Sequence, residues 1–199
     1  MAAPRWGEPR PGLLSRLAAR LRALLGEADR AGHDSLTHLP VALQRGERAA
    51  PYLEARRAGD HRRAGSAATA AMDRAVTAGE WWPADIWGHR ALWHFEQAGM
   101  ELAATRAARL IADVRVAAGD AESARRYYAE AISEARDIGA EREEGLAAMG
   151  LGRAQLQLGD VTTARRLAAI AIDLLERSDA PAAELDAADE LRGEEKEAR

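Results

Sequence analysis

The chain has 199 residues, of which 47% are hydrophobic and 30% are charged, and its formal net charge is −4. Alanine occurs 48 times, whereas valine and isoleucine, which favour β-strands, together occur 11 times. Since alanine, leucine, arginine and glutamate are strong helix formers, this composition excludes a β-rich fold and a largely disordered chain. The absence of cysteine excludes a disulfide framework, a thiolate metal site and a cysteine nucleophile.

Hydropathy and charge limit where the protein is expected to be located and what it is expected to bind. No apolar run approaches the roughly 20 residues that cross a bilayer, and arginines interrupt the leucine-rich stretch from Leu13 to Leu25, which argues against a signal peptide. We therefore expect a cytoplasmic protein without a membrane partner. Residues 1–66 carry an excess of basic groups, but acids are interleaved with them, so nucleic-acid binding is not expected. The excess of arginine over lysine is typical of a GC-rich bacterial coding sequence.

The N-terminal part, residues 1–58, is expected to cap the rest of the chain. Leucines at helical spacing predict an amphipathic helix over residues 12–31. Residues 32–40 are predicted to form a loop, and residues 41–58 a helix that Pro51 breaks.

A glycine recurs every twenty residues from position 59 to position 159, and an acid follows most of them. Glycine favours the left-handed conformation just past a helix end, and an acid suits the start of the next helix. Each interval therefore predicts one helix of about 17 residues and a tight turn, and short turns place neighbouring helices antiparallel. The glycines are Gly59, Gly79, Gly99, Gly119, Gly139 and Gly159.

Small residues also recur at fixed distances from every second glycine in residues 59–178. They lie seven positions before the glycine and five and twelve positions after it. Small side chains at fixed offsets let helices approach closely, so we expect these positions to be packed. The set around Gly119 is Ala112, Ala124 and Ala131, the set around Gly159 is Gly152, Ala164 and Ala171, and the set around Gly79 is Met72, Ala84 and Ala91.

This pattern resembles the tetratricopeptide repeat (TPR) family. The resemblance is carried by Ile111–Ala131, with Tyr128 at the aromatic position, and by Leu151–Ala171. Residues Met72–Ala91 depart from it, because Pro83 enters the second helix and Gly88 replaces the aromatic. The family's period is about 34 residues, so a period of 40 implies longer helices. The resemblance implies an all-α solenoid of antiparallel helix hairpins, with about three repeats over 59–178 and extra helices at both ends.

The C-terminal part, residues 179–199, is predicted to be a capping helix followed by a charged tail. Asp179 and Pro181 are interpreted as a helix start. Few large apolar residues follow them, as is typical of a polar cap.

Residues 81–95 contain four of the five tryptophans and the only phenylalanine. At helical spacing, Trp82, Ile86, His89 and Trp93 form a second apolar stripe opposite the expected core face, with Trp87 and His94 beside it. Such a stripe must be covered. The N-terminal helix or residues 41–58 could cover it, as could a homodimer or another protein through the Trp82/Trp93 face, or a small aromatic or cationic ligand.

The second candidate site is the inner groove that the TPR resemblance implies. The first helix of each hairpin lines that groove, and arginines there could bind a carboxylate or an acidic peptide. A surface arginine can equally be paired with a neighbouring acid. The positions that the resemblance assigns to the groove are Asp73, Arg106, Arg109, Asp113, Arg153 and Gln157, with Val76, Thr77, Val116 and Leu156.

No catalytic motif accompanies these sites. The serines lack a nucleophile-elbow context, phosphate-binding loops are absent, and the histidine spacing does not match a metal site, so no catalytic residue, metal or cofactor is assigned. We therefore expect a non-catalytic protein- or peptide-binding adaptor or regulatory module. The alternative is a small-molecule-binding protein or an unusual enzyme with a Trp/His-lined pocket around residues 81–95.

Overall fold

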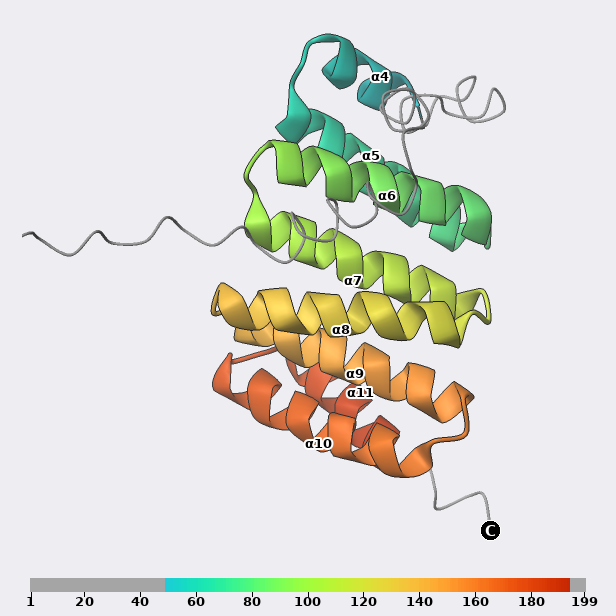
Figure 1. Ribbon diagram of the computed structural model, residues 1–199, viewed down its shortest axis with the longest axis vertical. Helices are drawn as coiled ribbons and strands as arrows, with labels where there is room; N and C mark the ends of the chain where they lie inside the picture. The colour runs from blue at the N-terminus through green and yellow to red at the C-terminus, as the bar shows by residue number, and fades with distance from the viewer. Residues whose placement is uncertain (1–48, 194–199) are drawn as a thin grey trace, which may run out of the picture. The chain divides into compact units, whose positions relative to one another are not determined.

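The computed structural model describes residues 49–193, all within one of the two compact units into which the chain divides, Leu39–Arg199. The described part is entirely helical and contains no strand (Figure 1). The predicted helix over 12–31, the loop over 32–40 and the charged tail after Gly193 lie outside these residues. The helices are α4 (Ala50–Arg57), α5 (His61–Thr77), α6 (Trp81–Gln97), α7 (Glu101–Ala117), α8 (Ala121–Asp137), α9 (Glu141–Gln157), α10 (Val161–Arg177) and α11 (Ala182–Gly193).

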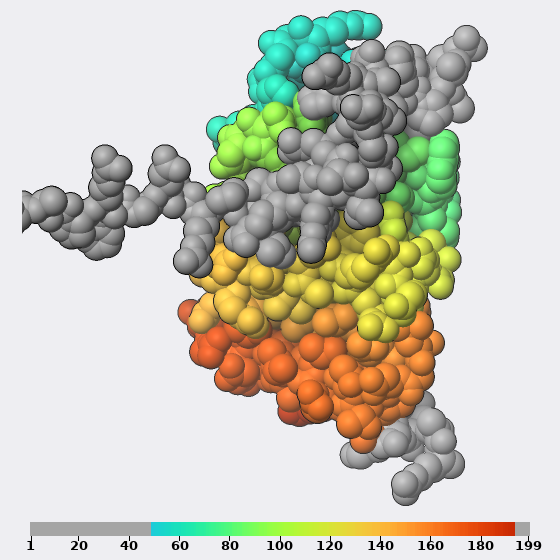
Figure 2. Space-filling view, viewed as in Figure 1, coloured from blue at the N-terminus to red at the C-terminus, as the bar shows by residue number. Residues whose placement is uncertain are grey.

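Each helix packs against the next one in the chain, and the helices from α4 to α10 follow one another in space in sequence order (Figures 1 and 2). Some contacts skip one helix: α7 also contacts α9, and α9 contacts α11. This pattern is consistent with a helical repeat. The helices from α5 to α10 have 17 residues each, as the spacing of the glycines predicts.

The chain reverses through the same three-residue turn after each helix from α4 to α9. The glycine in every such turn has a positive φ, for example +70° at Gly79, where a Cβ would be strained. In that turn the Gly79 amide donates to the Val76 carbonyl and the Glu80 amide donates to the Ala75 carbonyl, both at 2.9 Å. These two bonds are those of a Schellman motif, and they satisfy carbonyls at the end of the helix.

Acids after the glycines cap the next helices, as predicted for three of them. The carboxylates of Asp60, Asp120 and Asp160 accept hydrogen bonds from backbone amides three residues later, at 2.9, 3.1 and 3.0 Å. Each bond satisfies one of the amides that have no partner within the helix. Glu80 also precedes a helix, but its side chain makes no cap bond.

The small residues at the predicted offsets are buried, which confirms them as packing positions. Gly152 shows why size matters there, because a Cβ on it would lie 2.8 Å from the Cδ2 of Leu191. Gly88, at the position where the pattern has an aromatic, is also closely packed: a Cβ on it would lie 2.7 Å from the Cγ1 of Ile111. Gly150 is tighter still, because a Cβ there would lie 2.3 Å from the ring of Tyr128. The core is built from alanines and a few large side chains wedged against glycine.

The helix ends bear on two expectations. Of the stretch predicted to be a broken helix, residues 41–58, the structure describes residues 49–58, where α4 begins at Ala50 and Pro51 lies in its first turn. Helix α11 begins at Ala182, directly after Pro181, as the proline predicts. Asp179, which was interpreted as part of the same start, needs correction, because it lies in the turn after α10 with φ +51°. Its amide donates to the Glu176 carbonyl, so Asp179 occupies the place that glycine takes in the earlier turns.

Within residues 49–193, no helix combines the length and the apolar character needed to span a bilayer.

The turns can be tested by exchanging their left-handed residues. Replacing Gly139 by Ala should lower the free energy of unfolding by about 1–2 kcal/mol, because a Cβ there meets no atom within 4 Å and only the positive φ penalises it. Asp179→Gly should leave stability unchanged or raise it by up to about 1 kcal/mol, because the strain is then removed. Urea denaturation followed by circular dichroism measures both. Equal losses for the two variants would show that the turns do not require the left-handed conformation.

Candidate functional site

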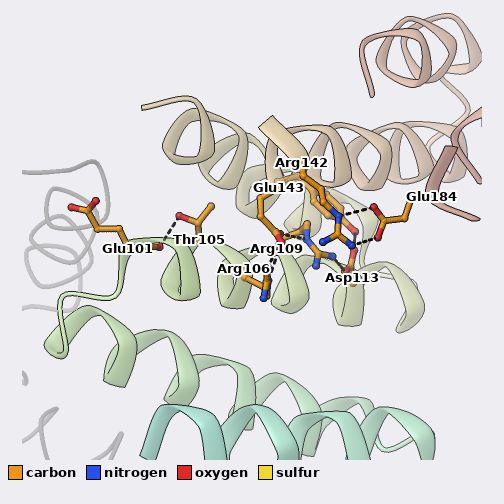
Figure 3. A network of polar contacts seen from close by, with 9 residues as sticks. Glu101, Thr105, Arg106, Arg109, Asp113, Arg142, Glu143 and Glu184 are labelled. Carbon is orange, nitrogen blue, oxygen red and sulfur yellow. Dashed lines mark hydrogen bonds and ion pairs between the residues drawn. The ribbon is translucent and has the colours of Figure 1, made fainter. Parts of the chain in front are cut away.

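Three of the predicted groove residues meet in one network of polar contacts. Arg106, Arg109 and Asp113 lie on α7, where their spacing of three and four residues places them on one face. Asp73 is exposed on α5 and takes no part in the network, and Arg153 is exposed on α9. Figure 3 shows the network, which joins α7 to α9.

The centre of the network is Glu143 on α9, a residue that the sequence did not single out. Its carboxylate accepts hydrogen bonds from the Nε of Arg106 at 2.9 Å and from the Nε of Arg109 at 3.0 Å. The side chain of Glu143 is only 5% exposed and that of Arg109 15%, whereas that of Arg106 is 50% exposed. The two arginines are thus held by an acid of the same chain, and only Arg106 keeps substantial access to solvent.

The network continues through Asp113 to α8. Arg109 Nη1 donates to Asp113 Oδ2 at 2.6 Å, and the hydroxyl of Tyr128 donates to Asp113 Oδ1 at the same distance. Burial and the neighbouring Asp113 carboxylate raise the pKa of Tyr128 well above its usual value. Tyr128 therefore fills the packing position that the repeat pattern assigns to it and also fixes a groove carboxylate.

Two more bonds join helices that lie two apart in the chain. Arg142 on α9 binds Glu184 on α11, with its Nε donating at 2.9 Å (Figure 3). This hydrogen bond is the main cause that lowers the pKa of Glu184. Gln157 reaches back from α9, and its Nε2 donates to the carbonyl of Val116 on α7 at 3.4 Å. Polar contacts thus link α7, α9 and α11 directly.

The other group of predicted residues, on α6, divides between two faces. Trp87 is 1% exposed and His94 2% exposed, and both face Tyr52 of α4. The Nε2 of His94 lies 3.3 Å from the Tyr52 hydroxyl, and its Nδ1 lies 3.0 Å from the Nδ1 of His61 on α5. Burial, then the nearby His61, Arg56 and Arg90, lower the pKa of His94 to about 4. His94 is therefore neutral at pH 7.

The stripe of Trp82, Ile86, His89 and Trp93 is partly covered within the described residues. Trp82 is 61% exposed, whereas the other three are half-buried. Trp93 packs on the ring of His61, with centroids 5.3 Å apart. A cover by the N-terminal helix involves residues outside the described part, and the homodimer through the Trp82/Trp93 face stays a prediction.

His89 of this stripe also belongs to a second cluster, which α6 forms with α7 and α8. The guanidinium of Arg115 binds Asp85 at 2.9 Å and lies 4.6 Å above the ring centre of Tyr127. His89 Nε2 lies 3.6 Å from Asp85 and 3.4 Å from Arg115. Burial, reinforced by Arg115 and opposed by Asp85, lowers the pKa of His89. This cluster joins α6, α7 and α8 and leaves His89 tied to an existing ion pair.

Sequence reasoning missed Glu143, Tyr52, His61 and Arg115, each of which contacts a residue that it had selected. The sequence does contain a pattern from which Glu143 could have been identified. The bonds of α7 with α9 and of α9 with α11 join residues 34 to 42 positions apart, close to the 40-residue period of the sequence. Opposite charges at about that separation are therefore candidates for pairing.

Among the described residues, no group of three or more His, Asp and Glu side chains is arranged to hold a metal ion. No protein-family model matches the sequence, and the search of curated proteins finds no match.

Removing the acid at the centre of the network should be costly. Glu143→Ala leaves the nearly buried Arg109 without one of its two carboxylates, so we expect the free energy of unfolding to fall by about 2–4 kcal/mol. The control is Glu122→Ala on α8, which breaks an ion pair whose carboxylate is 72% exposed and should cost less than about 0.5 kcal/mol. Denaturant unfolding compares the two. Similar small losses would mean that the network contributes little.

The buried His94 should make stability depend on pH. Its pKa is about 4 in the folded chain and about 6.5 when unfolded, so the unfolded state binds the proton first as pH falls. The contribution is complete above pH 6.5 and is lost progressively between pH 6.5 and 4, by about 2–3 kcal/mol. His94→Gln should therefore show a shallower loss between pH 7 and 4.5 in urea titrations. Parallel curves for both proteins would contradict this assignment.

Proposed function

We propose that the described helices form a TPR-like α-solenoid of antiparallel hairpins and that this array serves as a non-catalytic adaptor for a protein or peptide. In this proposal α5 with α6, α7 with α8, and α9 with α10 are the three repeats, and α11 is the C-terminal cap. The first helices α5, α7, α9 and α11 line the partner-binding groove.

The observation that carries the proposal is the direct contact of α7 with α9 and of α9 with α11. Each of these pairs skips one helix, as expected where the first helices of successive hairpins stand side by side. Turns of three residues between helices of equal length support the antiparallel arrangement. A row of such helices presents many side chains at fixed spacing, which suits the recognition of an extended partner.

The accessible arginines around the network favour an acidic partner. Four arginines lie in or beside the network, Arg106, Arg109, Arg142 and Arg153, against the three carboxylates of Asp113, Glu143 and Glu184. Arg106 is half exposed and Arg153 is exposed, so their guanidinium groups can bind carboxylates of a docked peptide. The paired Arg109 has a different role: it fixes the spacing of α7 and α9.

The small-molecule or enzyme alternative around residues 81–95 has less support. Trp87 and His94 are packed against Tyr52, and His89 is tied to Asp85 and Arg115. Packing accounts for Trp87, and pairing within the chain accounts for His89.

The adaptor is tested by selecting peptides from a random displayed library against the wild-type chain and measuring their affinity by fluorescence anisotropy. We expect selected peptides to be acidic. Reversing both accessible groove charges, Arg106→Glu with Arg153→Glu, should weaken binding at least tenfold, because two attractive contacts become repulsive.

The matched control is Arg126→Glu with Arg166→Glu, which makes the same change in net charge at exposed positions of the second helices α8 and α10. This variant should bind the selected peptides within about twofold of wild type. Equal weakening by both double variants would show a general charge effect and would overturn the groove.

A further inference from the structure

A buried arginine on α6 lacks a carboxylate partner. Arg90 is 4% exposed, yet no acid within residues 49–193 pairs with it. Its Nη1 donates to the Ile86 carbonyl of its own helix at 3.2 Å, and its guanidinium lies 5.8 Å from the ring centre of Trp87. Its Nε is buried and has no hydrogen-bond partner.

Such an arrangement is energetically unfavourable. A buried charge is ordinarily paired with an opposite charge, because removing it from water is costly, and a buried donor without an acceptor adds to that cost. The burial of Arg90 also lowers its pKa, which is the direction expected where desolvation is not balanced by an anion. The structure thus holds a cation whose counter-ion is missing from the described residues.

The surroundings of Arg90 add further cationic and donor groups. Helix α4 contributes Tyr52, whose hydroxyl accepts a hydrogen bond from the Arg90 guanidinium, and Arg56, whose positive charge lowers the pKa of Arg90; α5 contributes His61. His94, one turn beyond Arg90 on α6, links the Tyr52 hydroxyl to His61. We call Tyr52, Arg56, His61, Arg90 and His94 the α4–α6 cluster. No carboxylate is among the groups that shift the pKa of Arg90 or of His94.

We propose that the α4–α6 cluster is a binding site for a small oxyanion, a carboxylate or a phosphate group, which supplies the missing counter-ion of Arg90. The free Nε of Arg90 is the hydrogen-bond donor to the anion. Trp87 holds the guanidinium plane in place from one side. A guanidinium matches the geometry of both carboxylate and phosphate oxygens.

The burial of the cluster selects a small ligand. Arg90 and His94 are both nearly inaccessible, so an acidic side chain of a protein docked on the surface does not reach them. Helix α4 provides the route of entry. It is the shortest of the described helices, with eight residues where α5 to α10 have 17 and α11 has 12, so it offers the least packing to resist a local opening.

Inorganic phosphate and acetate are the two probes, each titrated against chloride at constant ionic strength and pH 7. Isothermal titration calorimetry measures affinity, and the fluorescence of Trp87 and its neighbours reports on the cluster. Once an anion exceeds its dissociation constant about twentyfold, the melting temperature should rise by about 3–6 °C. A response to phosphate alone or to acetate alone identifies the oxyanion, and no response to either overturns the site.

Arg90→Met locates the response. This variant should lose the anion-dependent rise, and without added anion it should melt at the same or a higher temperature than wild type, because an unpaired buried charge has been removed. The control Arg126→Met removes an exposed arginine on α8 and should respond as wild type does. If Arg90→Met still binds the anion with wild-type affinity, the assignment is wrong. Arg90→Lys, which keeps the charge but loses the planar fork, should bind at least fivefold more weakly and serves if the Met variant does not fold.

Discussion

The described structure depends on the left-handed reversal that ends its helices. Six glycines and Asp179 adopt positive φ, and each allows the amide of the next residue to reach back to a carbonyl of the preceding helix. These bonds close the helix end within three residues, so the following helix begins at a fixed angle and a fixed distance. With α5 to α10 all of one length, the small residues of one helix then meet those of its neighbours in the same register. Packing by alanine and glycine is possible only because this register is maintained.

Polar contacts supplement a core that is poor in large apolar side chains. Alanine contributes little buried area, so adjoining helices are further joined by ion pairs such as Arg109 with Glu143, Arg115 with Asp85 and Arg136 with Glu144. The arginines predicted to receive a partner therefore have two roles. Those at the centre of the network are structural, and those at its edge remain accessible.

The local features of this chain were predictable, and the contacts between distant residues were not. The glycine spacing, the caps at Asp60, Asp120 and Asp160, and the packed alanines follow from propensities that act over a few residues. The partner of Arg109 depends on how α7 is rotated against α9, and neither helix alone determines that rotation. Tyr52 and His61 were missed for the same reason, since they meet His94 only once three helices are in place. Asp179 misled the interpretation because aspartate serves both at helix starts and, less often, in the left-handed conformation.

The uniform twenty-residue unit has a consequence for how this chain can change. One residue inserted within a helix would rotate the rest of that helix by about 100° around its axis. The packed alanines beyond the insertion would then face solvent. One residue inserted beside a turn glycine would instead change only the turn between two helices. Duplication of two consecutive helices with their turns, forty residues in all, would preserve both the packed alanine positions and the spacing of the Arg–Glu ion pairs. Evolution, or an engineer, can therefore lengthen this protein in steps of two helices.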